Sequence, residues 1–205
     1  MTKPTDDTAA VRHRAKMEKR KAVQDAEVAG KTVEKGLLMV HTGPGKGKST
    51  AAFGLALRML GRGHRVGVVQ FIKGAWHSAE RDALTRFADQ VEWHSMGEGF
   101  TWETQDIKRD IAAAERAWGK ALELMADDSF ALVVLDELNI ALRYDYLDLA
   151  AVVEALRARR GGLHVIVTGR NAKPELIAAA DLVTEMTLVK HHFAAGVKAQ
   201  AGIEF

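Results

Sequence analysis

Residues 41–50, HTGPGKGKST, constrain the fold of this chain more than any other stretch. They follow a short apolar run, GLLMV, and precede a segment of helical character, STAAFGLALRML. A glycine-rich loop between a buried strand and a helix is the setting of a phosphate-binding loop, whose usual pattern is G-x-x-x-x-G-K-[ST]. Gly47, Lys48 and Ser49 fit that pattern, but Thr42 stands where its first glycine belongs. The segment therefore predicts a phosphate-binding loop that departs from the common NTPase form.

Apolar and helical segments alternate along the rest of the chain. The segments RVGVVQFI, QVEWHSM, FALVVLDE, LHVIVTG and DLVTEMTLV are expected to be strands. The segments SAERDALTRFA, QDIKRDIAAAERAWGKALELM, YLDLAAVVEALRARR and KPELIAAA are expected to be helices. This alternation predicts an α/β fold, with a single doubly wound parallel sheet of the P-loop NTPase (RecA-like) type and an N-terminal helical leader.

The leader differs from the rest of the chain in charge. Residues 1–35 hold nine Lys or Arg and six Asp or Glu, whereas residues 36–205 are nearly neutral and are expected to form one domain. Within the leader, residues 1–10 are expected to be disordered and residues 11–29 helical. Two interpretations of this helix stay open: a solvated leader, which the residues alone favour, or a segment that orders over a ligand or partner.

Composition excludes several classes of function. The chain has no cysteine, which rules out disulfides, thiolate nucleophiles and Cys-ligated metal clusters. No apolar run approaches the length of about 20 residues needed to span a bilayer, and the polar N-terminus predicts no signal peptide. The near-neutral body argues against nucleic-acid binding. We therefore expect a cytoplasmic protein without a membrane or nucleic-acid partner.

The loop and one strand end carry the chemistry expected for a magnesium–nucleotide complex. Gly43, Gly45 and Gly47 allow backbone N–H groups to turn toward phosphate oxygens. Lys48 would neutralise phosphate charge, and the hydroxyl of Ser49 would bind Mg²⁺. The run LVVLDE places Asp136 and Glu137 at the carboxyl end of a buried strand, the edge where open α/β sheets bind ligands. An acidic residue there can hold Mg²⁺ or its water shell.

Three weaker candidates remain, each with an ordinary structural alternative. Arg170 follows a buried strand and can reach phosphate, or it is a surface arginine. Phe100 and Trp102, on a loop with two glycines, either pack into the core or wall a large, flat, apolar ligand. His191 and His192 are a candidate metal pair, although a polar surface turn is the favoured interpretation.

With these residues in view, the chain resembles the P-loop ATP:corrinoid adenosyltransferases of vitamin B12 biosynthesis and salvage, the class acting on cobyrinic acid a,c-diamide and cobalamin. The resemblance runs from about residue 11 to Phe205. It rests on HTGPGKGKSTAAFG, VGVVQFIKG, GFTWETQD, VLDEL, YDYL, TGR and the tail VKAQAGIEF. The aromatic loop and the tail are more specific than the phosphate loop. In this family a threonine also precedes the first glycine of the loop, so Thr42 is expected there.

The resemblance implies an enzyme that transfers the 5′-deoxyadenosyl group of ATP to Co(I) of a corrinoid and releases the whole triphosphate. Mg²⁺ would assist, with Glu137 and Ser49 as its ligands, while Lys48 acts on the leaving triphosphate and Arg170 contacts phosphate. The nucleotide-binding set implied by the loop is Thr42, Gly43, Gly45, Lys46, Gly47, Lys48, Ser49 and Thr50.

The resemblance also assigns roles to the aromatic pair and the leader. Phe100 and Trp102 match the pair that crowds the lower face of the corrin, leaving a four-coordinate Co(II) that is easier to reduce. A reduced flavoprotein would deliver the electron. Family members are homodimers, and their N-terminal helix can cap the nucleotide and corrin sites.

Two rival functions of other classes stay open on the residues. A P-loop kinase would need an arginine-rich lid, and the run RARR at residues 157–160 is a candidate, although it is typical of an ordinary cationic helix end. A nucleic-acid-stimulated RecA-type ATPase would use the basic leader. A GTPase is disfavoured, because no N-K-x-D motif is present to read guanine.

Overall fold

The computed structural model describes residues 7–72, 79–87, 89–97 and 106–204. The chain divides into two units, Met1–Glu34 and Lys35–Phe205. No helix in the described ranges has the length and apolarity needed to cross a bilayer.

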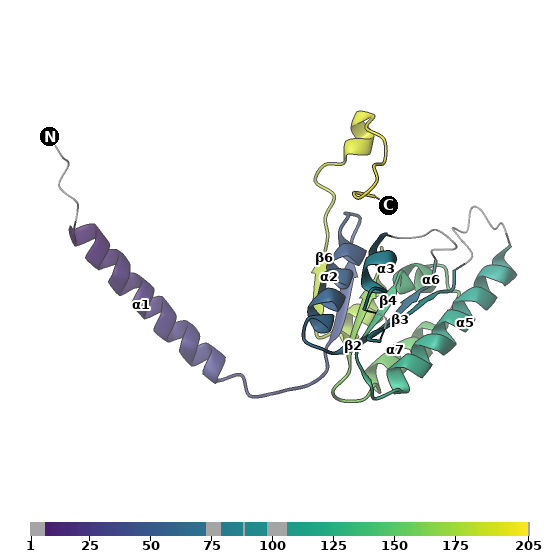
Figure 1. Cartoon of the computed structure of the whole chain (residues 1–205), viewed down its shortest axis with the longest axis horizontal. Coiled ribbons are helices and arrows are strands. Elements are labelled where there is room, and N and C mark those ends of the chain that lie inside the picture. Colours follow the sequence, from purple (N-terminus) through teal and green to yellow (C-terminus); the bar gives the residue numbers. More distant parts are fainter. Residues whose placement is uncertain (1–6, 73–78, 88, 98–105, 205) are drawn as a thin grey trace. The chain divides into compact units, whose positions relative to one another are not determined.

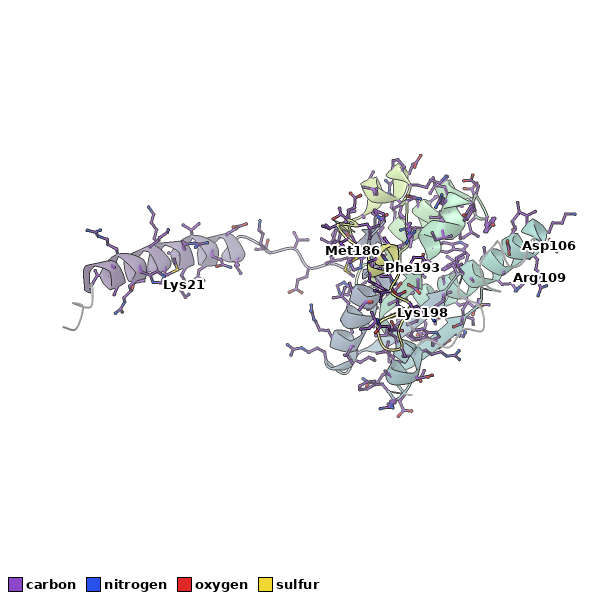
Figure 2. All side chains as sticks on the ribbon, turned by 90° about the horizontal axis from the view of Figure 1, so that it is seen from above. Lys21, Asp106, Arg109, Met186, Phe193 and Lys198 are labelled. Carbon is purple, nitrogen blue, oxygen red and sulfur yellow. The ribbon has the colours of Figure 1, made fainter. Side chains whose placement is uncertain are left out.

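In the first unit, residues 7–34 are described, and they form one helix, α1, which spans Asp7–Ala29. It begins inside the segment that was expected to be disordered, so that expectation is wrong for residues 7–10. Its side chains from residue 9 onward are exposed or half-exposed, and Figure 2 shows side chains, among them Lys21, projecting from the helix. Ion pairs one turn apart join Arg14 to Glu18 and Lys21 to Asp25. Such pairs add about 0.2–0.5 kcal/mol each to an isolated helix. Within this unit, α1 therefore depends on helix propensity and local pairs.

A six-stranded parallel sheet forms the centre of the second unit, in the order β3-β2-β4-β5-β1-β6 (Figure 1). Parallel strands require crossover connections, which the alternating helices supply. The expected doubly wound parallel sheet is therefore confirmed. The strands are β1 (Leu38–Thr42), β2 (Arg65–Gln70), β3 (Val91–Ser95), β4 (Phe130–Asp136), β5 (His164–Thr168) and β6 (Leu182–Glu185).

Helices cover both faces of the sheet and create two apolar cores. One core packs α2 and α3 against the sheet, and the other packs α5, α6, α7 and α8 against the opposite face. Figure 1 shows α2 and α3 on one side of the strands and α5 and α7 on the other. The helices are α2 (Lys48–Leu60), α3 (Ala79–Leu84), α5 (Ile107–Ala126), α6 (Leu138–Arg143), α7 (Leu149–Arg157) and α8 (Pro174–Ala179), with a 3₁₀ turn η1 (His192–Ala195).

The apolar run of β4 shows why its sequence lacks the alternation of a half-exposed strand. Leu132 and Val134 join the core beneath α2, whereas Val133 and Leu135 join the core beneath α5. Both faces of the strand are buried, so each position requires an apolar side chain. The same packing brings the carboxyl ends of the central strands to one edge of the sheet.

Some boundaries differ from those expected. The first strand was expected at residues 36–40, but β1 lies two residues later and includes His41 and Thr42. A Cβ on Gly36 would lie 2.1 Å from the Leu163 carbonyl oxygen, so this glycine makes a close backbone contact before the strand begins. Helix α6 was not anticipated, because six residues are too few for a helical period to be recognised.

Candidate nucleotide site at the carboxyl edge of the sheet

The glycine-rich loop turns sharply between β1 and α2. Gly43 and Gly47 have φ values of 95° and 103°, a conformation that side-chain-bearing residues rarely adopt. Gly45 is required by space, because an added Cβ would lie 2.5 Å from the Thr187 carbonyl oxygen. The Gly45 amide donates a hydrogen bond to the carbonyl oxygen of Met186, the residue after β6 (2.6 Å). The segment after β6 therefore braces one side of the loop.

Thr42 occupies the last position of β1, before the left-handed turn begins. Its hydroxyl accepts a hydrogen bond from the Ala172 amide (3.0 Å), and its carbonyl oxygen accepts one from the Met186 amide (2.9 Å). The residue that needs a positive φ is Gly43, so the chain has no conformational need for glycine at position 42. The threonine instead ties the loop to the segment that follows β5.

Lys48 opens α2, and its side chain is buried. Its ammonium group donates a hydrogen bond to the Gly45 carbonyl oxygen and thus lies beneath the loop. Burial lowers the pKa of Lys48 from the ordinary value of 10.5; the charge of Glu137 opposes this shift, and those of Arg170 and Lys46 reinforce it. Three other predicted site residues are therefore close enough to act on this ammonium group.

The two acids at the end of β4 have different surroundings. Asp136 is fully buried, and its carboxylate accepts hydrogen bonds from Gln70 Nε2 (3.0 Å) and Thr168 Oγ1 (2.8 Å). Glu137 has a φ of 64° and caps the start of α6, while its amide donates to Thr168 Oγ1 (3.0 Å). A Cβ on Gly169 would lie 3.0 Å from a Glu137 carboxylate oxygen, so the glycine leaves room for this acid. Asp136 holds strand ends together, and Glu137 faces the turn after β5.

A polar network that the sequence did not predict extends along the same edge. Gln70 Oε1 accepts hydrogen bonds from Ser95 Oγ (2.8 Å) and Trp93 Nε1 (3.2 Å). The Asn139 amide group donates to the Gly169 carbonyl oxygen (2.9 Å). The signal for Gln70 and Thr168 was available, because each is a polar last strand residue that directly follows a run of apolar residues. Asn139 gave no such signal, because it lies in the helix that was not anticipated.

The remaining predicted residues lie at the surface of this site or outside the described ranges. Arg170 is exposed in the turn after β5, and Lys46 is exposed and forms an ion pair with Glu204 (2.6 Å). Ser49 is half-buried and Thr50 exposed, both in the first turn of α2. Phe100 and Trp102 lie outside the described residues. The structure therefore brings the loop, Glu137 and Arg170 together and leaves the aromatic pair undescribed.

The arrangement suits a polyphosphate bound with a divalent cation. The positive end of a thirteen-residue helix, a buried ammonium group and an exposed guanidinium would face negative charge. A hydroxyl from Ser49 and a carboxylate from Glu137 are oxygen ligands of the kind that Mg²⁺ prefers. The residues present therefore fit magnesium. Glu137 is the more accessible of the two acids, because it is partly exposed whereas Asp136 is fully buried.

Comparison with known proteins gives matches over nearly the whole chain. Residues 34–205 match the family described as "ATP:corrinoid adenosyltransferase BtuR/CobO/CobP", and residues 4–28 match "Cob(I)alamin adenosyltransferase N terminal". A corrinoid adenosyltransferase from Pseudomonas aeruginosa is 58% identical over 95% of this chain and 96% of its own length. A corrinoid adenosyltransferase from Sinorhizobium sp. is 55% identical over 95% of this chain and 92% of its own length. One from Salmonella typhimurium is 47% identical over 95% of this chain and 98% of its own length.

One solved structure, EssC (ATPases 2 and 3) from Geobacillus thermodenitrificans, aligns with this chain at 12% sequence identity and a TM-score of 0.42. The alignment covers 82% of this chain and 36% of the EssC chain. A likeness this distant carries no argument. The assignment rests instead on the curated relatives and on the match across residues 34–205. The chain belongs to the ATP:corrinoid adenosyltransferase family.

Proposed function

We propose that this protein is a transferase that moves the 5′-deoxyadenosyl group of ATP to the Co(I) centre of a corrinoid and releases triphosphate. The observation that carries the proposal is the family match across residues 34–205, in a chain 46–58% identical to five corrinoid adenosyltransferases over most of its length. This activity belongs to adenosylcobalamin biosynthesis.

In this proposal the triphosphate lies in the loop of residues 42–50. Backbone amides around Gly43, Gly45 and Gly47 would hydrogen-bond its oxygens, and Lys48 would neutralise its charge from below. Lys46 and Arg170 would approach from the exposed side. The charges of Lys46 and Arg170 both act on the Lys48 ammonium group, which supports this assignment because it shows that the three cations lie near one another at the loop.

Ser49 and Glu137 would hold Mg²⁺ against the triphosphate. The ion supplies charge neutralisation for the leaving group. The hydrogen bonds of Asp136 support the choice of Glu137, because the Asp136 carboxylate already serves Gln70 and Thr168. The turn at Glu137 and the absence of a side chain at Gly169 together give its carboxylate a position beside the loop after β5.

The chemical step needs no nucleophile from the protein. An electron pair of Co(I) forms a bond to C5′ of ATP, the C5′–O bond breaks, and that electron pair leaves on the triphosphate. The substrate cobalt supplies the reacting pair, which fits a chain without cysteine. The protein contributes position, charge stabilisation of the leaving triphosphate and exclusion of water.

The corrin side of the site remains a proposal from the sequence. Phe100 and Trp102 would wall the lower face of the corrin and exclude its axial ligand. A reduced flavoprotein would supply the electron that converts Co(II) to Co(I). The enzyme would act in the cytoplasm as a homodimer. Leader residues 1–35 would form a cap over the domain of residues 36–205. The match of residues 4–28 to an N-terminal family segment supports a role for this leader.

The experiment that tests the proposal supplies the purified protein with Mg-ATP and a chemically reduced Co(I) corrinoid. We expect a light-sensitive cobalt–carbon product, visible as a change in the corrin absorption spectrum that reverses on illumination. Lys48→Ala is the matched control, because it removes the buried cation under the triphosphate, and it should lose most of the turnover. Near-wild-type activity in a folded Lys48→Ala protein would remove the loop from the mechanism.

A further inference from the structure

A cluster of potential metal ligands lies on the segment that follows β6, next to the proposed nucleotide site and joined to it by the ion pair between Glu204 and Lys46. His191 and His192 stand at the start of η1, and the chain then turns back (Figure 1). Glu204 forms an ion pair with His192. One ligand atom from each of the three residues lies within 4.8 Å of the other two. Figure 2 labels Phe193, the next residue after the pair, on this segment. Residues 12 and 13 positions apart in the chain therefore lie close together.

The ligand atoms of the cluster lie close enough together for one ion to reach all three. His192 Nε2 lies 2.9 Å from Glu204 Oε1, yet Oε1 is buried and has no hydrogen-bond partner among the described residues. The two imidazole rings stack with their centroids 4.7 Å apart. In a tetrahedral site with bonds of about 2.0–2.1 Å, neighbouring ligand atoms stand roughly 3.3 Å apart. A small metal ion would thus fit between the three ligand atoms after a modest movement of the side chains.

We propose that His191, His192 and Glu204 form a binding site for a divalent transition metal of the zinc type. Two imidazoles and one carboxylate are a ligand set that zinc accepts, with a fourth position open to water. Imidazole nitrogen favours zinc, copper, nickel or cobalt over magnesium, which prefers oxygen ligands. The site is therefore distinct in chemistry from the magnesium position proposed at Ser49 and Glu137.

Two contacts of the ligands compete with the metal and keep its binding reversible. His191 Nδ1 accepts a hydrogen bond from the Phe193 amide (3.1 Å), which a metal at that nitrogen would displace. Lys46 Nζ lies 2.6 Å from Glu204 Oε2. A cation therefore already occupies one carboxylate oxygen, while the other oxygen lies beside His192.

The contact with Lys46 links the tail to the phosphate loop. A metal ion bound to Glu204 would compete with Lys46 for the same carboxylate and so weaken the ion pair between Glu204 and Lys46. Because Lys46 and the metal would draw on the same carboxylate charge, each weakens the binding of the other. Replacing Lys46 should consequently strengthen metal binding, which gives the proposal a second test of opposite sign.

The test is a Zn²⁺ titration of the full chain without an affinity tag, followed by calorimetry in the absence of nucleotide and corrinoid. We expect one Zn²⁺ per chain, at least about tenfold weaker binding in His192→Ala and in Glu204→Gln, and tighter binding in Lys46→Ala. His64→Ala is the matched control, since His64 is exposed on a turn far from this segment in sequence, and it should bind Zn²⁺ as the unchanged protein does.

Cobalt provides a readout of geometry that does not depend on affinity. Co²⁺ bound by the three ligands should give the intense visible absorption of a four-coordinate ion, and that band should vanish in His192→Ala. Equal Zn²⁺ affinity in the unchanged protein, His192→Ala and Glu204→Gln would overturn the proposal. So would a Co²⁺ spectrum that survives in His192→Ala. Because neither measurement involves ATP or corrinoid, the proposal can fail without affecting the assignment of adenosyl transfer.

Discussion

Thr42 and Gly43 illustrate how single residues determine the form of the phosphate loop. The left-handed turn begins at Gly43, and the preceding residue is free to carry a side chain. Thr42 uses that freedom to hydrogen-bond the Ala172 amide, which anchors the loop to the segment containing Arg170. The departure from the usual motif therefore adds a link between two parts of the proposed triphosphate site.

Asp136 and Glu137 should respond differently to substitution, although they are neighbours. Asp136→Ala leaves the Gln70 and Thr168 donors without an acceptor in a buried place, and each unsatisfied group costs about 1–3 kcal/mol of unfolding free energy. Glu137→Gln should keep its stability but lose magnesium-dependent turnover by about 10²-fold or more. Urea unfolding and turnover of both variants check this. The prediction would be contradicted if Asp136→Ala were stable but inactive and Glu137→Gln remained active, because Asp136 would then be the magnesium ligand.

The lowered pKa of Lys48 predicts how ATP binding depends on pH. Burial makes the folded protein release the Lys48 proton at a pH below the ordinary 10.5, and the neutral amine binds phosphate less well. ATP affinity should therefore fall as the pH rises toward that lowered value, by roughly 10- to 100-fold for the loss of one charged hydrogen bond. Lys48→Arg is the control, because its guanidinium stays charged. Parallel pH profiles for both proteins would contradict the prediction.

Phe100 and Trp102 can be tested by supplying cobalt in two oxidation states. If they wall the corrin, Phe100→Ala and Trp102→Ala should react poorly with Co(II) corrinoid and a mild protein reductase, because the axial ligand stays bound. Much of the activity should return with Co(I) corrinoid, which holds no lower ligand tightly. If they pack in the core instead, stability should fall by about 3–5 kcal/mol. Equal loss of activity in both oxidation states would mean that the rings only position the substrate.

At the scale of elements, α1 stands out because its side chains from residue 9 onward are exposed or half-exposed, so packing says little about its role. Within its own unit it buries little surface, and the core of the second unit begins with β1. Deleting residues 1–30 should therefore leave the melting temperature nearly unchanged and lower the affinity for corrinoid if the leader is a cap. Thermal melts and corrinoid titration of the truncated chain measure both effects. Unfolding on truncation would show that the leader is part of the core.

The elements that the sequence predicted well are those with strong, long signals. The buried strands around Val133 and Val165 are continuous apolar runs, and α5 carries a full apolar face, so their existence follows from hydrophobic patterning. Helix α6 was missed because a six-residue segment holds less than two turns. The early start of α1 at Asp7 was missed because polar composition alone does not separate an exposed helix from a disordered segment.

For the site too, features within a short stretch of sequence were predicted, whereas contacts between residues far apart in the sequence were not. The glycine positions and Lys48 were predicted, because a loop motif lies within ten consecutive residues. The Thr42 link to Ala172, the Gln70 bridge to Asp136 and the pairing of Lys46 with Glu204 were not, because each joins residues 66 to 158 positions apart. Such contacts depend on strand order, which a motif does not specify.

At the scale of the whole molecule, the proposed enzyme uses a phosphate loop to release an intact triphosphate. A kinase or an ATPase with the same loop would cleave between phosphorus atoms and yield ADP. The reaction proposed here cleaves at C5′, so the chain of three phosphates survives. Product identity therefore separates adenosyl transfer from the rival functions more directly than any binding measurement.

The most direct measurement is phosphorus NMR of a reaction with Mg-ATP and Co(I) corrinoid, followed alongside the light-sensitive cobalt–carbon product. The account predicts one tripolyphosphate for each adenosylated corrinoid, no ADP, and neither product in Lys48→Ala. Formation of ADP and phosphate without a cobalt–carbon bond would contradict it, as would tripolyphosphate release that does not depend on the corrinoid.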